Sequence, residues 1–268
     1  MTDINRHNQL SWDQQSAAGQ SPWVQPVTTD AVNAARAGDW QIILTPTKSV
    51  PKSWFGDLKD KDLLCLASGG GQQVPILAAA GAVVTSFDQS PEQLRKDTDV
   101  AARDNLSIQC LQGDMADLSV FNDASFDVIV HPVSNIFAAD ILPVWQHCAR
   151  LLRPGGRLLS GFMNPDFFLF DHWDIDEGGP LEVKFKLPYA DLTHVDPEVL
   201  KQRMAEQQAL EFGHSFDAQI GGQLAAGLVI AGFYEDQWSD EDTPLNSYMS
   251  TSMATLAIKP AADWPPGL

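Results

Sequence analysis

At residues 63–71 the chain reads Leu63-Leu64-Cys65-Leu66-Ala67-Ser68-Gly69-Gly70-Gly71. Five apolar residues without a polar break are typical of a strand that is buried on both faces, as strands of a parallel sheet are. The glycines that follow permit positive φ and let a ligand approach the backbone. Residues 72–80 then have a helical pattern, with Pro75 in the first turn, where proline is tolerated. The run therefore predicts a strand, a tight turn and a helix.

The same order of elements repeats downstream. Four further strands are predicted at residues 82–87, 108–112, 126–130 and 157–162. Helices are predicted from Ser90-Pro91-Glu92 onward, at 141–152 and at 220–231, and Arg153-Pro154-Gly155-Gly156 is predicted to be a turn. Gly232-Phe233-Tyr234 leads into a late strand, and residues 255–258 form the last one. Strands that alternate with helices indicate an α/β fold with a mostly parallel sheet.

Four segments are expected along the chain. Residues 1–61 form an N-terminal cap or lid, with a helix at 31–38 that Asp30 caps and a proline-marked ordered loop at 44–51. Residues 62–164 form the cofactor-binding core. Residues 165–215 are an insertion that covers the substrate side, partly β because residues 181–187 alternate at period two. Residues 216–268 complete the sheet with a helix and strands.

Composition excludes several classes of partner. The chain of 268 residues has 17 Lys and Arg against 35 Asp and Glu, a formal net charge of −18. Such a charge repels phosphate backbones and anionic lipid heads, so neither nucleic acid nor membrane is expected as a partner. The N-terminus has no apolar segment, and no apolar run approaches the ~20 residues of a membrane span, which predicts a cytoplasmic protein. Three cysteines without CxxC spacing predict neither disulfides nor a metal site.

The polar residues at the predicted strand ends are the candidates for a binding site. In an open parallel sheet, ligands bind beyond the carboxyl ends of the strands. Asp88, nineteen residues after Gly69, suits an acid that accepts from both ribose hydroxyls. In the segment 113–115, Asp114 can meet an adenine amino group and Met115 can lie against the ring. His131 follows the fourth strand. Together these positions predict a cofactor that contains a nucleoside.

Two nucleotide-binding motifs are absent or altered. The dinucleotide fingerprint requires Gly or Ala where Val74 stands, which disfavours a nucleotide-dependent oxidoreductase. No GK[ST] sequence is present for a nucleoside triphosphate.

At this point the sequence resembles the class I S-adenosylmethionine-dependent methyltransferases over roughly residues 60–163. The segments that carry the resemblance are 64–71, Phe87-Asp88, 113–115, 125–129 and Leu151-Leu152-Arg153-Pro154-Gly155-Gly156-Arg157-Leu158. The tail Ala231-Gly232-Phe233 resembles the entry to the family's sixth strand. The whole chain is also similar to a bacterial group of uncharacterised methyltransferase-like proteins, with residues 44–48 and 66–72 in common.

The resemblance implies a fold, a cofactor and site residues. The fold is a Rossmann-like, doubly wound, seven-stranded sheet with helices on both faces, an N-terminal cap and an insertion after the fifth strand. The cofactor is S-adenosylmethionine, with S-adenosylhomocysteine as product. The residues expected to bind it are Ala67, Ser68, Gly69, Gly70, Gly71, Asp88, Gln89, Gly113, Asp114, Met115 and His131.

The chain departs from the family pattern at three places. Cys65 stands where the family has an acid that helps to hold the methionine end, and Ala67 replaces the first glycine. Backbone carbonyls near Ala67 and His131, or residues 45–48, are expected to supply the missing contact. Residues 131–134 replace the Asn/Asp-Pro-Pro-Tyr signature of planar amine methylation, so the acceptor atom stays open.

The expected function is methyl transfer to a small-molecule acceptor, by a monomer or homodimer. Methyl transfer from a sulfonium needs positioning and exclusion of water more than proton transfer. His131 is the candidate general base, with a structural histidine as the equal alternative. Asn135, Phe167, Phe168 and His172 are the candidates for substrate contact, the phenylalanines alternatively forming the core of the insertion. The alternatives are a cofactor-binding protein of the same fold without catalysis, and a nucleotide-dependent oxidoreductase.

Overall fold

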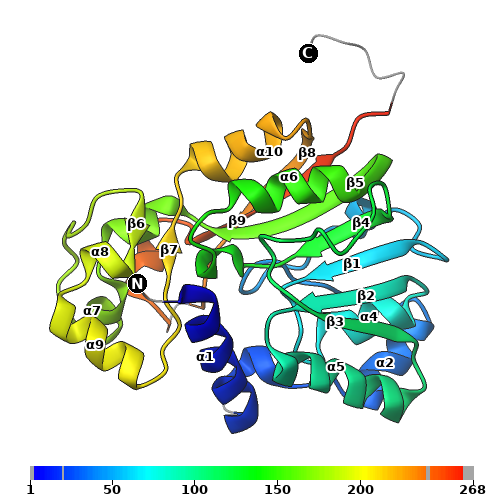
Figure 1. Cartoon of the computed structure of the whole chain (residues 1–268), viewed down its shortest axis with the longest axis horizontal. Helices are drawn as coiled ribbons and strands as arrows, with labels where there is room; N and C mark the ends of the chain where they lie inside the picture. Colours follow the sequence, from blue (N-terminus) through cyan, green and yellow to red (C-terminus); the bar gives the residue numbers. More distant parts are fainter. Residues whose placement is uncertain (1–2, 20, 240–241, 262–268) are drawn as a thin grey trace.

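The computed structural model describes residues 3–19, 21–239 and 242–261. Its centre is a seven-stranded sheet in the order β3-β2-β1-β4-β5-β9-β8 (Figure 1). The strands are β1 (Asp62–Leu66), β2 (Val83–Asp88), β3 (Ile108–Gln112), β4 (Phe126–His131), β5 (Leu152–Met163), β8 (Val229–Asp236) and β9 (Ser252–Ile258). β1 to β5 run parallel, and β9 lies antiparallel between β5 and β8. The predicted seven-stranded, mostly parallel sheet is confirmed.

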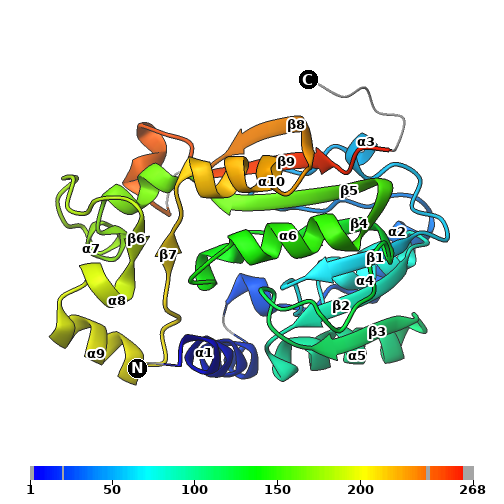
Figure 2. The same cartoon turned by 45° about the horizontal axis from the view of Figure 1, so that its top comes forward.

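Helices cover both faces of this sheet (Figures 1 and 2). One face packs against α4 (Gln73–Ala79) and α5 (Pro91–Asp104), on which α2 (Thr29–Arg36) lies. The other face packs against α6 (Leu142–Leu151) and α10 (Gly222–Ala225). Alternate residues of β1 enter the two cores: Leu63 and Cys65 point to the first, Leu64 and Leu66 to the second. All four are fully buried. The apolar run at residues 63–66 is therefore continuous because both of its faces are core.

The chain reverses its winding between β1 and β4, which are neighbours in the sheet although β2 and β3 lie between them in sequence. Such a point leaves a crevice beyond the carboxyl ends of the strands, where ligands bind in folds of this kind. The turn after β1 and the segment after β4, with η2 (Asn135–Phe137), therefore face the same space.

The polar N-terminus is a helix, which the sequence did not predict. α1 (Ile4–Ala18) is capped by Asp3, whose side chain accepts from the Arg6 amide, and ends at Gly19 in the left-handed region. Fully buried Asn8 donates to the carbonyl oxygens of Phe137 and Leu210, at 3.1 and 3.0 Å. α1 thus connects the segment that follows β4 with the segment around residue 210 (Figure 2). The 3-10 turn η1 (Pro22–Val24) follows.

Residues 165–215 form a separate lobe beside the sheet (Figure 1). Its elements are η3 (Pro165–Leu169), α7 (His172–Asp176), β6 (Tyr189–Ala190), α8 (Asp191–His194), α9 (Pro197–Ala205) and β7 (Phe212–Gly213). β6 and β7 pair with each other. The strand predicted at 181–187 is wrong: these residues form no strand, and Leu181 and Val183 are 42% and 68% exposed. Period-two alternation produces a strand only where one face is buried.

Three further boundaries differ from expectation. The helix predicted at 220–231 ends at Ala225, after a π-helical turn at Asp217–Gly221, and β8 begins at Val229. Thr28, not Asp30, caps the helix predicted at 31–38, which begins at Thr29. The predicted turn at 153–156 lies inside β5, which begins at Leu152.

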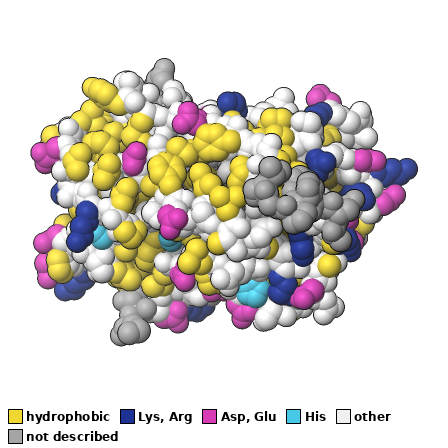
Figure 3. Space-filling model, turned by 90° about the horizontal axis from the view of Figure 1, so that it is seen from above, with side chains coloured by type: hydrophobic (Ala, Val, Ile, Leu, Met, Phe, Trp, Pro, Cys, Tyr) yellow, Lys and Arg dark blue, Asp and Glu magenta, His cyan; other side chains and the backbone are white. Residues whose placement is uncertain are grey.

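Two short elements complete the chain, α3 (Lys52–Phe55) and η5 (Pro244–Ser247). Apolar side chains gather over the region where α10 and β8 lie (Figure 3). Leu224 and Phe233 of these elements are about half exposed. No helix in the described part of the chain is both long and apolar enough to cross a membrane.

Candidate functional site

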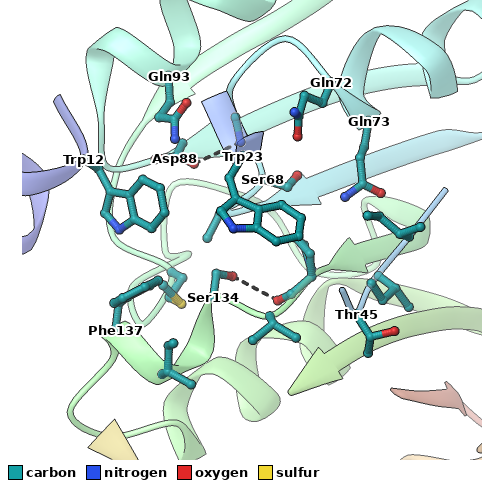
Figure 4. A pocket seen from close by; sticks show the side chains of 18 of the residues that line it. Trp12, Trp23, Thr45, Ser68, Gln72, Gln73, Asp88, Gln93, Ser134 and Phe137 are labelled. Carbon is teal, nitrogen blue, oxygen red and sulfur yellow. Dashed lines mark hydrogen bonds between the residues drawn. The ribbon is translucent and has the colours of Figure 1, made fainter. Parts of the chain in front are cut away.

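A cavity of about 280 Å³ opens at the carboxyl ends of β1, β2 and β4 (Figure 4). Its size is close to the lower end of the ~300–1,000 Å³ typical of small-molecule pockets. The residues that line it are Trp12, Trp23, Ile43, Leu44, Thr45, Pro46, Ala67, Ser68, Gly69, Gln72, Gln73, Asp88, Gln89, Gln93, Met115, Pro132, Val133, Ser134, Ile136, Phe137, Met163, Glu211 and Trp238. The core, the N-terminal segment and the lobe at 165–215 all contribute to this wall.

The turn after β1 is held in shape by its neighbours. The Ala67 amide donates to the Phe87 carbonyl oxygen at 2.8 Å, and the Gly70 amide to that of Gln93 at 3.1 Å. Ala67 has φ 49°, in the left-handed region that favours glycine. A Cβ atom on Gly69 would lie 2.9 Å from Gln93 Cβ. Close packing against α5 therefore excludes larger side chains at Gly69.

Asp88 ties the end of β2 to this turn. Its Oδ2 accepts from the Gly69 amide at 3.0 Å, and its Oδ1 accepts from the Ser90 amide at 2.9 Å. Burial raises the pKa of Asp88 to about 6, although these two hydrogen bonds lower it. Each carboxylate oxygen retains acceptor capacity for a further hydrogen bond.

Behind the turn lies a second acid, Asp97, which sequence reasoning missed. Fully buried on α5, it accepts from the Gly71 amide and from the Ser86 hydroxyl, each at 2.7 Å. Burial raises the pKa of Asp97 to about 7, against the lowering effect of both hydrogen bonds. Asp97 thus fixes the last glycine of the turn. An acid three residues after apolar Leu94 was a signal of a buried helix face that could have pointed to it.

Three buried polar atoms of residues around the cavity have no hydrogen-bond partner among the described residues. They are Ser68 Oγ, Gln73 Oε1 and Gln93 Oε1. Buried polar groups are normally paired, and a site that binds a polar ligand is a common reason for exceptions. Figure 4 shows these three side chains around the same space as Asp88 and Trp23. Their chemistry fits a ligand with both donors and acceptors, such as an amino-acid-linked nucleoside.

The structure brings six of the predicted cofactor residues to the cavity and leaves five outside it. Those in its wall are Ala67, Ser68, Gly69, Asp88, Gln89 and Met115. Gly70, Gly71, Gly113, Asp114 and His131 are not part of the wall. A Cβ atom on Gly113 would lie 2.1 Å from the Phe87 ring, so packing accounts for that glycine. Asp114 Oδ2 accepts from Asn5 Nδ2 at 2.5 Å, so this acid binds α1.

His131 lies beneath the cavity and is fully buried. Its Nδ1 is 3.0 Å from the Leu66 carbonyl oxygen, and its ring packs edge-on to Trp145 with centroids 6.0 Å apart. Burial lowers the pKa of His131 to about 4, although the hydrogen bond to Leu66 raises it. The imidazole is therefore neutral near pH 7, with Nδ1 as donor, and links β4 to β1.

The predicted substrate residues also lie behind the wall. Asn135 is fully buried and donates to Gln219 Oε1 at 2.9 Å. Phe167 and Phe168 belong to the apolar core of the lobe. The His172 ring lies against Phe167, with centroids 4.9 Å apart, and its Nε2 is 3.1 Å from Glu211 Oε2. Glu211 does line the cavity, so His172 reaches the site through a residue that sequence reasoning missed.

Aromatic side chains that the sequence did not single out as ligand contacts form much of the wall. Trp12 of α1 meets Phe137 edge-on, with centroids 5.2 Å apart, and Trp23 of η1 meets Trp238 at 5.7 Å. These two pairs join the N-terminal segment to the segments that follow β4 and β8. Figure 4 shows the Trp12 and Trp23 indoles beside the cavity.

The proline-marked loop at 44–51 contributes other groups to the cavity wall than the sequence predicts. Thr45 and Pro46 line the cavity. The Thr47 and Lys48 amides instead donate to Asp236 Oδ2, at 2.9 and 2.8 Å, and Lys48 Nζ donates to the Glu235 carbonyl oxygen. The Thr47 and Lys48 groups considered for the methionine end therefore hold the end of β8.

The comparisons with known proteins agree with this architecture. Residues 64–160 match the model of a methyltransferase domain family. The chain is 46% identical, over 97% of its own length and all of the relative's, to the uncharacterised methyltransferase YbaJ of Bacillus subtilis. It is also similar to a solved putative S-adenosylmethionine-dependent methyltransferase from Listeria monocytogenes, with 17% identity and TM-score 0.60, over 78% of this chain and 95% of that one.

A second solved structure extends the similarity of fold to nearly the whole chain. It is the 1,6-didemethyltoxoflavin-N1-methyltransferase of Burkholderia thailandensis, with bound 1,6-didemethyltoxoflavin and S-adenosylhomocysteine. Identity is 13% and the TM-score 0.58, over 97% of this chain and 92% of that one. Given its sheet order, its cavity and its full-length relative, the chain belongs to the class I S-adenosylmethionine-dependent methyltransferase family.

Proposed function

We propose that the protein transfers a methyl group from S-adenosylmethionine to a small-molecule acceptor held in the cavity at the ends of β1, β2 and β4. The observation that carries the proposal is the set of unpartnered buried atoms, Ser68 Oγ, Gln73 Oε1 and Gln93 Oε1, around a cavity that also contains Asp88. Membership of the methyltransferase family supplies the reaction class.

The residues present can hold the cofactor in two parts. Asp88 has free acceptor capacity for ribose hydroxyls, and Met115 and Gln89 flank it in the wall. Ser68, Gly69 and Thr45 offer hydroxyl and backbone groups to the methionine part, where Cys65 offers nothing because it is buried in β1. When bound, the cofactor supplies an activated methyl group.

The chain itself positions the reactants and excludes water. Trp12, Trp23 and Phe137 surround the space with apolar surface, which orients a flat acceptor and keeps solvent from its nucleophile. We assign His131 a positioning role, because its imidazole does not line the cavity and its Nδ1 is bonded to Leu66. Residues 165–215 are the substrate-side cover in this proposal, through Glu211.

A cofactor-binding protein without catalysis is the second candidate, favoured by Cys65 at the position of the family's acid. Calorimetry with S-adenosylmethionine, S-adenosylhomocysteine and NAD tests the cofactor. We expect binding of the first two and none of NAD. Release of S-adenosylhomocysteine from S-adenosylmethionine with a fractionated metabolite extract then separates enzyme from binder. Binding without release from any fraction would favour the second candidate.

A further inference from the structure

We propose that Glu211 is the acceptor-binding group of the cavity and that it selects a flat amine that is neutral or positively charged, against anionic acceptors. This inference rests on the proposed function, because it assigns the acceptor part of the same cavity. Glu211 precedes β7 in the lobe, whereas Asp88 ends β2 in the core. Figure 2 shows β7 on the side of the lobe and β2 across from it.

The charges of the cavity wall point to this class of acceptor. Among its described residues, Asp88 and Glu211 are the charged side chains, and both are acids. Asp88 is tied to the glycine turn through the Gly69 amide. Within residues 3–19, 21–239 and 242–261, no Lys, Arg or His lines the wall to pair with an anionic acceptor. Burying an unpaired anion beside two carboxylates is costly, whereas a carboxylate favours a donor or a cation.

Contacts with its neighbours hold both the backbone and the side chain of Glu211. The backbone amide donates to Asp191 Oδ2 at 2.8 Å, the backbone carbonyl oxygen accepts from the Asp191 amide at 3.1 Å, and the carboxylate contacts His172 Nε2. Asp191 Oδ1 in turn accepts from the Tyr189 hydroxyl at 2.6 Å. A binding group that is fixed in advance loses little conformational entropy when a ligand arrives.

His172 occupies one oxygen of Glu211 and leaves the other for a ligand. The His172 Nε2 to Glu211 Oε2 distance is 3.1 Å, and Phe167 and Phe168 enclose the imidazole. Burial lowers the pKa of His172, but the hydrogen bond and charge of Glu211, with Asp191 and Asp176, raise it overall. One imidazole thus stands among three carboxyl groups, and the neighbourhood remains acidic.

The aromatic wall fits the flat part of such an acceptor. Trp12, Trp23, Trp238 and Phe137 line the same cavity as Glu211. Indole faces attract cations and stack on flat rings. An aromatic wall with a carboxylate therefore recognises a ring and an amine together.

The test uses three probes that share one ring and differ in charge: indole-3-ethylamine, indole-3-ethanol and indole-3-acetate. Each is titrated calorimetrically at pH 7.5 into the full chain, with and without saturating S-adenosylhomocysteine. We expect the amine to bind about tenfold more tightly than the alcohol, as a charge-assisted hydrogen bond implies. We expect the acetate to bind most weakly.

Two variants assign the preference to Glu211. Glu211→Gln keeps the side-chain shape and the backbone bonds to Asp191, and should abolish the preference for the amine. Glu211→Asp keeps the negative charge and should retain part of the preference for the amine. Glu206→Gln is the matched control, since exposed Glu206 of the same lobe does not line the cavity, and its preference should equal that of the native chain.

The outcomes separate this inference from the proposed function. Failure of S-adenosylhomocysteine to bind would contradict the proposed function, and the probe preferences of the unliganded chain would still decide the role of Glu211. Binding of S-adenosylhomocysteine with equal affinity for the three probes, with none binding, or with the same preference in Glu211→Gln, would overturn the inference.

Discussion

The core at residues 62–164 and the segments that flank it both contribute residues to the cavity wall, but different kinds of contact position those residues. In the core, β1 and β4 bury alternate residues in two apolar layers, and the cavity turn follows from the strand order. The flanking segments reach the cavity through single contacts: Asn8 on the Leu210 backbone, Trp12 on Phe137, and Asp191 on Glu211. Periodic packing therefore forms the part of the cavity wall that we propose for the nucleoside. Individual polar and aromatic contacts form the part that we propose for the acceptor.

The largest expected effect lies in the core, at Asp88. Asp88→Ala removes the acceptor proposed for the ribose and should weaken S-adenosylmethionine binding by about 1.5–3 kcal/mol, the range for hydrogen bonds to a charged group. Calorimetry measures the change. The matched control is Asp114→Ala, another strand-end acid that bonds Asn5 and does not line the cavity. Equal losses in both variants would contradict the assignment of Asp88.

Two acids of the core, partly buried Asp88 and fully buried Asp97, also predict a dependence of stability on pH. The pKa values of Asp88 and Asp97 are raised by burial to about 6 and about 7, so the folded state binds protons more tightly than the unfolded chain. The contribution of these two groups to the free energy of unfolding is therefore greatest below pH ~4. It falls as the pH rises through about 6 and about 7, the pKa values of the two acids in the folded state. Each unit of pKa displacement corresponds to about 1.4 kcal/mol.

Urea unfolding at pH 5.5 and 7.5 measures this dependence, with the higher free energy of unfolding expected at pH 5.5. Asp97→Asn, which does not titrate, should flatten it. A native chain that is more stable at pH 7.5 would show that both acids ionise without penalty, against the burial that the fold gives them.

These core features were largely predictable from the sequence, and the flanking features were not. Strand β3 has the predicted bounds, both ends of β2 lie one residue later than predicted, and β4 ends one residue later than predicted. A strand that is buried on both faces needs a continuous run of apolar residues, and such a run can be recognised in the sequence. Trp12 and Glu211 have no such pattern around them, because each reaches the cavity through tertiary contacts that no local period encodes. The sequence singled out His131 and His172 as candidate site residues because of their side-chain chemistry. It did not predict that both side chains are buried.

A smaller effect is expected in the flanks, at Trp23. Trp23→Ala removes an aromatic wall and its contact with Trp238, and should weaken cofactor or acceptor-probe binding by about 0.5–1.5 kcal/mol. Trp40→Ala is the control within the same N-terminal segment, since Trp40 packs on Phe55 and does not line the cavity. It should lower the thermal midpoint and leave the affinity unchanged. Full affinity in Trp23→Ala would show that the N-terminal segment covers the cavity without contacting ligand.

The smallest effect concerns Ala67, where the chain departs from the family's glycine. With φ 49°, Ala67 is in a region of backbone conformation that disfavours side chains, so Ala67→Gly relieves strain in the folded state. The glycine also raises the conformational entropy of the unfolded chain, which offsets part of this gain. The net gain in free energy of unfolding should be a few tenths to about 1 kcal/mol. Ala79→Gly, in the last turn of α4, should instead lose about 0.5–1 kcal/mol. A loss in both variants would mean that Ala67 is not strained.

The most direct test of the account is a crystal structure of the protein with S-adenosylhomocysteine and indole-3-ethylamine. We predict the ribose hydroxyls on Asp88, the homocysteine part along Ser68 and Gly69, and the amine within hydrogen-bond distance of Glu211 Oε1. Density for the nucleoside outside the cavity at the ends of β1, β2 and β4, or a nucleoside there that makes no contact with Asp88, would contradict it.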